Sequence, residues 1–108
     1  MKTTVVHCKK DEYDVSIARP SMYGNPFKIG PDGTRTDVCD KHMEWLENPE
    51  EVIIEVNGVK YSNEAVRENV HKLKGLRIAC WCAPKRCHGN NLVKLLELQT
   101  KKQFVELD

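Results

Sequence analysis

A strand–loop–helix pattern over residues 76–98 constrains the fold of this chain more than any other feature. Residues 76–82 form a short apolar run with few polar breaks, which is typical of a strand buried on both faces. Pro84 ends this strand, because proline cannot donate to the hydrogen-bond ladder of a sheet. From Leu92 onward the apolar residues recur at helical spacing. The pattern therefore predicts a buried strand that feeds a helix through a tight loop.

The loop of this unit is suited to binding an anion. A helix that follows a strand through a short loop directs its free N–H groups at the carboxyl end of the strand, where open α/β sheets bind ligands. Asn90 or Asn91 could cap that helix, because the asparagine side chain accepts from first-turn amides. The loop also contains Lys85, Arg86 and His88, which can pair with a phosphate or a carboxylate. We expect an anion-binding cradle here, and the alternative is an ordinary solvated loop.

Three cysteines and a histidine crowd the same loop, and three hypotheses stay open for Cys80, Cys82, Cys87 and His88. The C-x-C-x4-C-H spacing departs from the paired cysteines of zinc sites, so we expect no bound metal. Cys87 stands at the helix start beside Arg86 and His88, a setting that lowers a thiol pKa and creates a nucleophile. The third hypothesis is that the thiols are small buried side chains.

Length, charge and cysteine count narrow the class of protein. A chain of 108 residues is expected to form a single domain, residues 1–108. The formal net charge is +1, so a broad nucleic-acid-binding surface is not expected and any anion site must be local. The odd count of five cysteines, with no signal-peptide pattern at the start, indicates free thiols in a cytoplasm. No apolar run reaches membrane-spanning length, so we expect no membrane partner.

A second group of polar residues lies in an irregular loop over residues 19–27, which contains two prolines and a glycine. Arg19 can hold a phosphate through two parallel hydrogen bonds, and the aromatic residues could flank a flat ring. Gly24 permits close approach of the backbone to a ligand. The candidate ligand-binding residues of this loop are Arg19, Ser21, Tyr23, Gly24 and Asn25. The alternative is a surface loop whose aromatic side chains pack inward.

The remaining elements follow from local patterns. The sequence predicts strands over residues 3–8 and 13–18, helices from about 34 to 46 and from 62 to 73, a hairpin over 51–61 with Asn57-Gly58 at its tip, and a short last strand over 103–107. Strands that alternate with helices indicate an α/β sandwich. We expect a small Rossmann-like fold with a mostly parallel central sheet and an added β-hairpin. The strand at residue 76 should be central and parallel to residues 3–8.

Two long motifs carry a resemblance to a known family. They are residues 14–27 (DVSIARPSMYGNPF) and residues 79–89 (ACWCAPKRCHG). Together they resemble a phage and bacterial family, domain-of-unknown-function family 4326, over nearly the whole chain. The hairpin at Asn57 looks like an addition to the shorter family pattern. The resemblance implies a compact Rossmann-like α/β domain, in the host cytoplasm if a phage encodes it, and it implies no particular activity.

These observations favour a protein that binds a phosphorylated, nucleotide-type small molecule at the carboxyl edge of the sheet, without a cofactor. Arg19, Ser21 and the amides near Gly89 and Asn90 would hold phosphate, and Tyr23 or Trp81 would contact a base or ribose. In a phage setting the protein could sequester a nucleotide signal. One alternative is an enzyme that acts on a nucleotide or an N-glycosidic bond with Cys87 and His88, and another is a zinc-stabilised interaction module. The sequence leaves the oligomeric state open.

Overall fold

The computed structural model describes residues 2–107, with side chains described for residues 2–100. Along the chain the elements are β1 (Thr4–His7), β2 (Val15–Ser16), α1 (Arg35–Glu47), β3 (Ile53–Val56), β4 (Val59–Ser62), α2 (Asn63–Asn69), the 3-10 helix η1 (Val70–Leu73), β5 (Arg77–Cys80) and α3 (His88–Leu107). This is an α/β fold, as the sequence predicts, with one parallel sheet and one separate hairpin.

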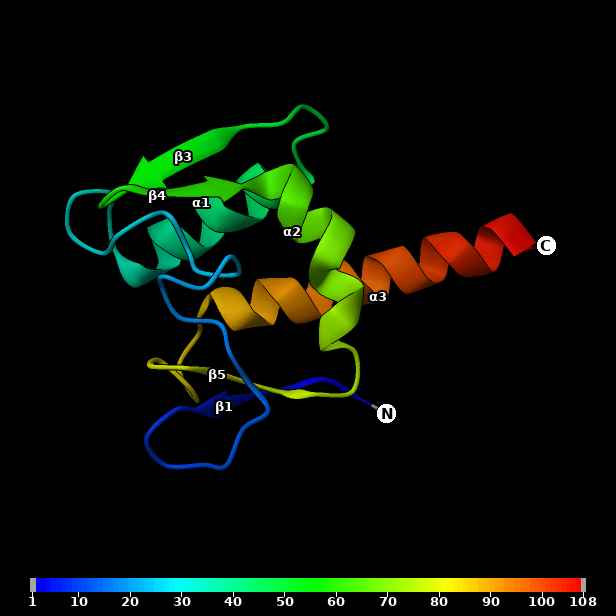
Figure 1. Ribbon diagram of the computed structural model, residues 1–108, viewed down its shortest axis with the longest axis horizontal. Coiled ribbons are helices and arrows are strands. Elements are labelled where there is room, and N and C mark those ends of the chain that lie inside the picture. Colours follow the sequence, from blue (N-terminus) through cyan, green and yellow to red (C-terminus); the bar gives the residue numbers. More distant parts are fainter. Residues whose placement is uncertain (1, 108) are drawn as a thin grey trace.

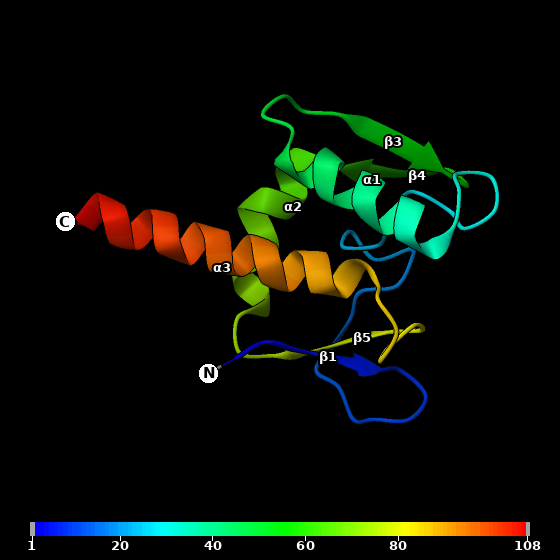
Figure 2. The same cartoon turned by 180° about the vertical axis from the view of Figure 1, so that it is seen from behind.

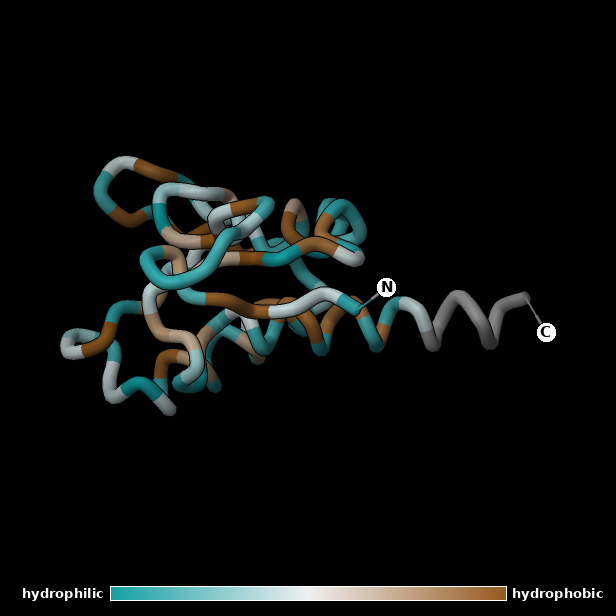
Figure 3. Tube along the Cα trace, turned by 90° about the horizontal axis from the view of Figure 1, so that it is seen from below, coloured by the Kyte–Doolittle hydropathy of each residue, from teal (hydrophilic) through white to brown (hydrophobic). Residues whose placement is uncertain are grey.

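The parallel sheet has the strand order β1-β5-β2, with β5 in the centre. Val5 and Val15 flank Ile78 from the two sides in parallel register. Helix α3 runs across one face of this sheet, and α1 with the β3–β4 hairpin lies beyond α3 (Figures 1 and 2). The apolar stretch of β1 runs alongside α3 through the middle of the molecule (Figure 3). The predicted central strand and its parallel pairing with β1 are therefore confirmed.

Strands β2 and β5 are shorter than predicted. β5 ends at Cys80, because the chain turns from Trp81 onward, ahead of Pro84. Cys82 therefore lies in the loop and not in the strand. Only Val15–Ser16 pairs in β2. Directly before β2, Asp14 Oδ2 accepts a hydrogen bond from the backbone N–H of Arg77 at 2.8 Å. The Asp14 carboxylate therefore pairs with a backbone N–H of β5 that a backbone carbonyl would accept if the two strands paired further.

Helix α3 begins earlier and ends later than predicted. It starts at His88, and Asn90 lies within its first turn, where its Oδ1 accepts from the backbone N–H of Cys87 at 2.9 Å. Asn90 and Asn91 are therefore helical residues rather than the N-terminal cap. The predicted last strand over residues 103–107 is wrong, because α3 continues to Leu107. Extending an existing helix adds one hydrogen bond for each residue, and this outweighs a short β-prone pattern.

Local signals placed α1 and the hairpin correctly. Thr34 Oγ1 accepts from the Asp37 N–H at 3.2 Å, and Asp37 Oδ2 accepts from the Thr34 N–H at 2.9 Å, which completes a capping box. At the hairpin tip Asn57 has φ 51° and Gly58 has φ 80°. A type I′ turn requires positive φ at both positions, so the Asn-Gly prediction is confirmed.

Replacing both Asn57 and Gly58 by alanine should lower the free energy of unfolding by about 1–3 kcal/mol, because alanine is strained at positive φ. A Cβ on Gly58 would meet no atom within 4 Å, so the loss reports backbone strain alone. Urea titration followed by circular dichroism measures it, with the exposed strand substitution Lys60→Ala as the control. The hairpin contributes no residue to the pocket described below, so ligand affinity should survive.

Asn63 joins α1, α2 and the segment between α1 and β3 at one buried point. Its side chain is 0% exposed, and its Nδ2 donates to the carbonyl oxygens of Trp45 at 2.8 Å and Glu50 at 3.0 Å. Its Oδ1 accepts from the N–H groups of Val52 at 2.7 Å and Glu64 at 2.9 Å. One amide therefore pairs backbone groups from α1, from the segment between α1 and β3, and from α2.

Candidate functional site

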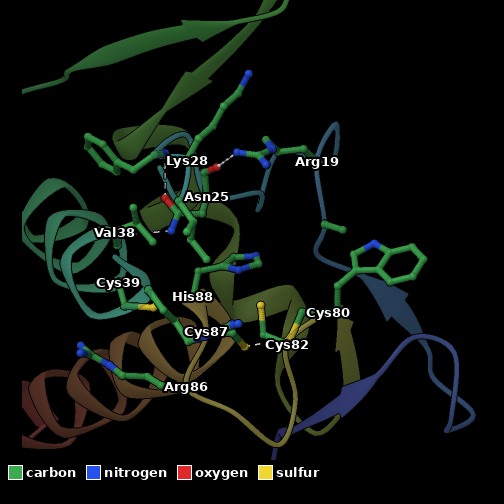
Figure 4. Close-up of a pocket in the computed structure, with 15 residues that line it drawn as sticks. Arg19, Asn25, Lys28, Val38, Cys39, Cys80, Cys82, Arg86, Cys87 and His88 are labelled. Carbon is green, nitrogen blue, oxygen red and sulfur yellow. Dashed lines mark hydrogen bonds between the residues drawn. The ribbon is translucent and has the colours of Figure 1, made fainter. Parts of the chain in front are cut away.

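A cavity with a volume of about 440 Å³ lies at the carboxyl ends of β2 and β5. It is bounded by the loop after β2, by the first turns of α1, and by the loop from β5 into α3 (Figure 4). Arg19 and His88, from the two loops that the sequence analysis singled out, both line it. Parallel strands end at a common edge, and this topology brings two distant loops together.

The charged side chains that line the cavity are all cationic. They are Arg19, Lys28, Arg35 and Arg86, and no aspartate or glutamate among residues 2–100 lines the cavity. Arg86 donates to Asp40 at 2.7 Å outside the cavity, so its charge is partly compensated. Nη1 of Arg35 is buried and has no hydrogen-bond partner among residues 2–100. An unpaired buried donor is costly, and a bound anion would satisfy it.

Arg19 is held in place by the tight geometry of its loop. Its Nη1 donates to the carbonyl oxygen of Asn25 at 3.1 Å (Figure 4). A Cβ on Gly24 would lie 2.8 Å from Cγ of Arg19 and 3.0 Å from the Ser21 carbonyl oxygen, so only glycine fits beside this arginine. Gly24 therefore serves the packing of Arg19. It does not line the cavity itself.

Asn25 lines the cavity, but its side chain anchors the loop. Its Nδ2 donates to the Val38 carbonyl oxygen at 3.2 Å, and its Oδ1 accepts from the Phe27 N–H at 2.9 Å. Both amide atoms are thus engaged with the backbone, one of them on α1 (Figure 4). The structure assigns Asn25 the role of fixing the loop against α1.

His88 is a buried neutral imidazole at the inner end of the cavity. Its Nε2 lies 2.7 Å from the Ile17 carbonyl oxygen, so Nε2 carries the proton and Nδ1 does not. Burial lowers the pKa of His88, and the charge of Arg19 adds to the effect. His88 is therefore a polar group of the cavity at neutral pH, without the positive charge that anion pairing would need.

His42 of α1 packs against His88 with the two rings 5.5 Å apart in an edge-to-face arrangement. Nδ2 of Asn91 donates to the Cys39 carbonyl oxygen at 2.8 Å and lies 3.0 Å from Nδ1 of His42. His42 Nδ1 must therefore accept, which places its proton on Nε2. Burial, followed by the neighbouring His88, lowers the pKa of His42 well below its usual range. The side chain of His42 is fully buried.

Four thiols line the cavity: Cys39, Cys80, Cys82 and Cys87. The Sγ atoms of Cys80 and Cys87 are 2.8 Å apart (Figure 4). The hydrogen bond from Cys87 lowers the pKa of Cys80, assisted by the backbone N–H groups of Cys82 and Ala83. The same pairing and burial raise the pKa of Cys87. The directions of these two pKa shifts favour the thiolate at Cys80, whereas the sequence pointed to Cys87 as the nucleophile.

Other predicted residues lie elsewhere. Tyr23 is buried in the core, where its hydroxyl donates to the Asn69 carbonyl oxygen at 3.0 Å, so it cannot stack on a ligand. Ser21 Oγ accepts from the Tyr23 N–H at 3.2 Å. Lys85 is exposed outside the cavity. A Cβ on Gly89 would lie 2.9 Å from Cδ1 of Ile17, so this glycine serves the close packing of α3 on the sheet.

The structure brings together six of the predicted ligand-binding or catalytic positions at the cavity: Arg19, Asn25, Trp81, Arg86, Cys87 and His88. Trp81 is 60% exposed, and the ammonium of Lys9 lies 5.4 Å from its ring centroid. Among residues 2–100, no group of three or more histidine, cysteine or acidic side chains is arranged to hold a metal ion.

Sequence reasoning missed Lys28 and Arg35. Arg35 is the first residue of α1, directly after its cap, Thr34. A cation in the first turn opposes the helix dipole, which favours negative charge there. That local conflict is a signal for a functional residue, and it could have identified Arg35 from the sequence.

The family model described as "Domain of unknown function (DUF4326)" matches residues 3–98. The chain belongs to this family. Both loops of the cavity fall within the matched DUF4326 region.

The chain is also similar to a phage protein. The chain is 28% identical over 101 residues to the "Uncharacterized 12.4 kDa protein in nrdA-td intergenic region" of Enterobacteria phage T4, covering 93% of this chain and 82% of that protein. No solved structure matches this DUF4326 member. Within the described residues, no helix combines the length and the apolar character that crossing a bilayer needs.

Proposed function

We propose that the protein binds a phosphorylated, nucleotide-type small molecule in the cavity at the carboxyl edge of its sheet. The observation that carries the proposal is the charge of the lining, with Arg19, Lys28, Arg35 and Arg86 and no acidic side chain among residues 2–100. The net charge of the whole chain is only +1, so this concentration of positive charge is local. A phosphate is the biological anion that best matches several guanidinium groups.

The size and the rim of the cavity support a ligand larger than a free phosphate. Its volume of about 440 Å³ lies in the range of small-molecule sites, roughly 300–1,000 Å³. Trp81 presents an exposed ring at the rim, and Phe27 adds a second aromatic side chain to the lining. Such rings can stack on a flat base. In this arrangement Arg19 and Arg35 hold the phosphate, and Trp81 contacts the base.

Binding of nucleotides can be tested by isothermal titration with adenosine and guanosine mono-, di- and triphosphates. Arg19→Gln or Arg35→Gln should weaken binding roughly tenfold or more, because each removes a charge-assisted contact worth about 1.5–3 kcal/mol. Arg19→Lys keeps the charge but loses the planar fork, so it should also weaken binding.

The matched control is Lys85→Gln, which removes one positive charge from an exposed position outside the cavity. It should leave the affinity within a factor of about two, since an exposed charge is screened by salt. Equal losses in Lys85→Gln and Arg19→Gln would contradict the proposal and indicate general electrostatic attraction. Failure of all six nucleotides to bind at millimolar concentration, with no phosphorylated compound found by mass spectrometry of the purified protein, would also contradict it.

A further inference from the structure

Cys80 and Cys87 form a pair of thiols at the base of the cationic cavity. Their Sγ atoms are 2.8 Å apart, and a disulfide bond is about 2.05 Å long, so closure requires the two sulfur atoms to approach by roughly 0.8 Å. Within residues 2–100 this is the only pair of thiols within hydrogen-bonding distance. Both side chains line the cavity, although each exposes only 1–2% of its surface.

The two sulfurs are chemically unequal. The hydrogen bond between the two thiols lowers the pKa of Cys80, and the backbone N–H groups of Cys82 and Ala83 add to this effect. Cys87 is favoured as the protonated partner. The thiolate is the nucleophile in thiol chemistry, so the pair has an attacking sulfur and a resolving sulfur. Because Cys80 is so little exposed, the oxidant that reaches it must be small.

We propose that Cys80 and Cys87 are a reversible dithiol–disulfide couple that hydrogen peroxide oxidises. The Cys80 thiolate attacks one peroxide oxygen, an S–O bond forms, the O–O bond breaks, and the departing hydroxide takes up a proton to become water. The Cys87 sulfur then attacks Cys80 Sγ, an S–S bond forms, the S–O bond breaks, and hydroxide leaves with the thiol proton as a second water. The two thiols are oxidised by two electrons and the peroxide is reduced.

This couple goes beyond nucleotide binding and does not depend on it. Cys82 is less buried than the pair, and no sulfur contact to it lies within hydrogen-bonding distance among residues 2–100. Cys39 has a pKa raised by burial, so it is a weak competitor for peroxide.

Peptide mapping of the whole protein after peroxide treatment tests the proposal. Trypsin separates residues 78–85 from residues 87–94, so a Cys80–Cys87 bond links these two peptides with the loss of two hydrogen atoms. The experiment uses wild type and Cys82→Ser, since Cys82 shares a peptide with Cys80. We expect the linked peptide in both proteins and its disappearance after dithiothreitol. Absence of the link, or its loss in Cys82→Ser, would overturn the proposal.

The order of attack can be tested separately with dimedone, which traps sulfenic acid. In Cys87→Ser, peroxide should leave a dimedone adduct on Cys80, whereas Cys80→Ser should give at least tenfold less adduct on Cys87. An adduct that forms on Cys87 in Cys80→Ser as fast as on Cys80 in Cys87→Ser would overturn the assigned roles. Near-identical circular dichroism spectra for both variants and wild type establish that the comparison concerns folded protein.

Discussion

Replacing Asn63 by alanine is expected to lower the free energy of unfolding by roughly 3–5 kcal/mol, the largest effect of any single polar substitution in this protein. The substitution removes the partner of two carbonyl groups and two backbone N–H groups at once; the bond to Trp45 is buried and the other three are partly buried. Each buried group left without a partner costs about 1–3 kcal/mol, although water entering the new space would offset part of this. For a domain of this size the melting temperature should fall by roughly 15 °C or more.

Two further variants separate hydrogen bonding from packing. Asn63→Leu keeps the branched shape and the number of side-chain heavy atoms but loses every hydrogen bond, so it should be about as destabilised as Asn63→Ala. Asn69→Ala is the matched control, because Asn69 is half-buried and its side chain donates one bond, to the Ala65 carbonyl oxygen at 2.8 Å. It should cost about 1 kcal/mol. Thermal and urea unfolding give the values, and recovery of stability in Asn63→Leu would show that the space, and not the hydrogen bonds, matters.

Stability is expected to fall steeply as the pH drops from 7 to 5, because His42 and His88 are both buried in neutral form. Their pKa values in the folded protein lie below the ordinary value of 6.5. Below pH 6.5 the unfolded chain binds protons at these positions and the folded chain does not, so the free energy of unfolding decreases as the pH falls. The slope approaches about 1.4 kcal/mol per pH unit for each histidine.

The structure explains why His42 resists protonation. Its Nδ1 faces the Nδ2 donor of Asn91, so a proton there would oppose another N–H group. His42→Gln should be less stable at pH 7 but should show a shallower pH dependence. His71→Gln, at an exposed position, should keep the wild-type slope. Urea titrations at half-unit pH steps measure this, and an unchanged slope in both His42→Gln and His88→Gln would exclude the buried histidines as the cause.

Stability is expected to fall again at a lower pH, and the groups responsible are two carboxylates. The hydrogen bonds from Arg77 lower the pKa of Asp14, and those from Thr34 lower the pKa of Asp37, relative to the ordinary value of 3.8. Their stabilisation is present above that value and is lost as the pH falls further through the folded-state pKa values. Between pH 7 and 5, where the histidines lower the stability, Asp14 and Asp37 therefore stay ionised and do not contribute to the slope.

Residues whose roles are set by near neighbours in sequence were the predictable ones. Thr34 and Asp37 are three residues apart, and Asn57 and Gly58 are adjacent, so the capping box and the hairpin tip could be recognised locally. The central position of β5 followed from its apolar composition. The parallel register brought Arg19 and His88 to one edge of the sheet, as the order of elements implied.

Residues whose roles depend on distant partners could not be assigned in this way. Tyr23 was expected beside a ligand, yet its hydroxyl donates to Asn69, 46 residues further along the chain. Asn63 gives no sign in the sequence that it pairs with backbone groups of other segments. The thiol asymmetry depends on the 2.8 Å approach of Cys80 to Cys87, which no spacing rule predicts. Tertiary geometry decided each of these roles.

The strand order has a consequence for how the protein is made. β5 lies between β1 and β2 but is the last strand to be synthesised, and Thr3 bonds to Leu73 across 70 residues of chain. During translation the two N-terminal strands have no partner until residues 77–80 leave the ribosome, so the sheet and its cavity can assemble only late in synthesis. Contacts of such long range also slow folding. A nascent chain halted before β5 should therefore carry the hairpin and α1 but no sheet.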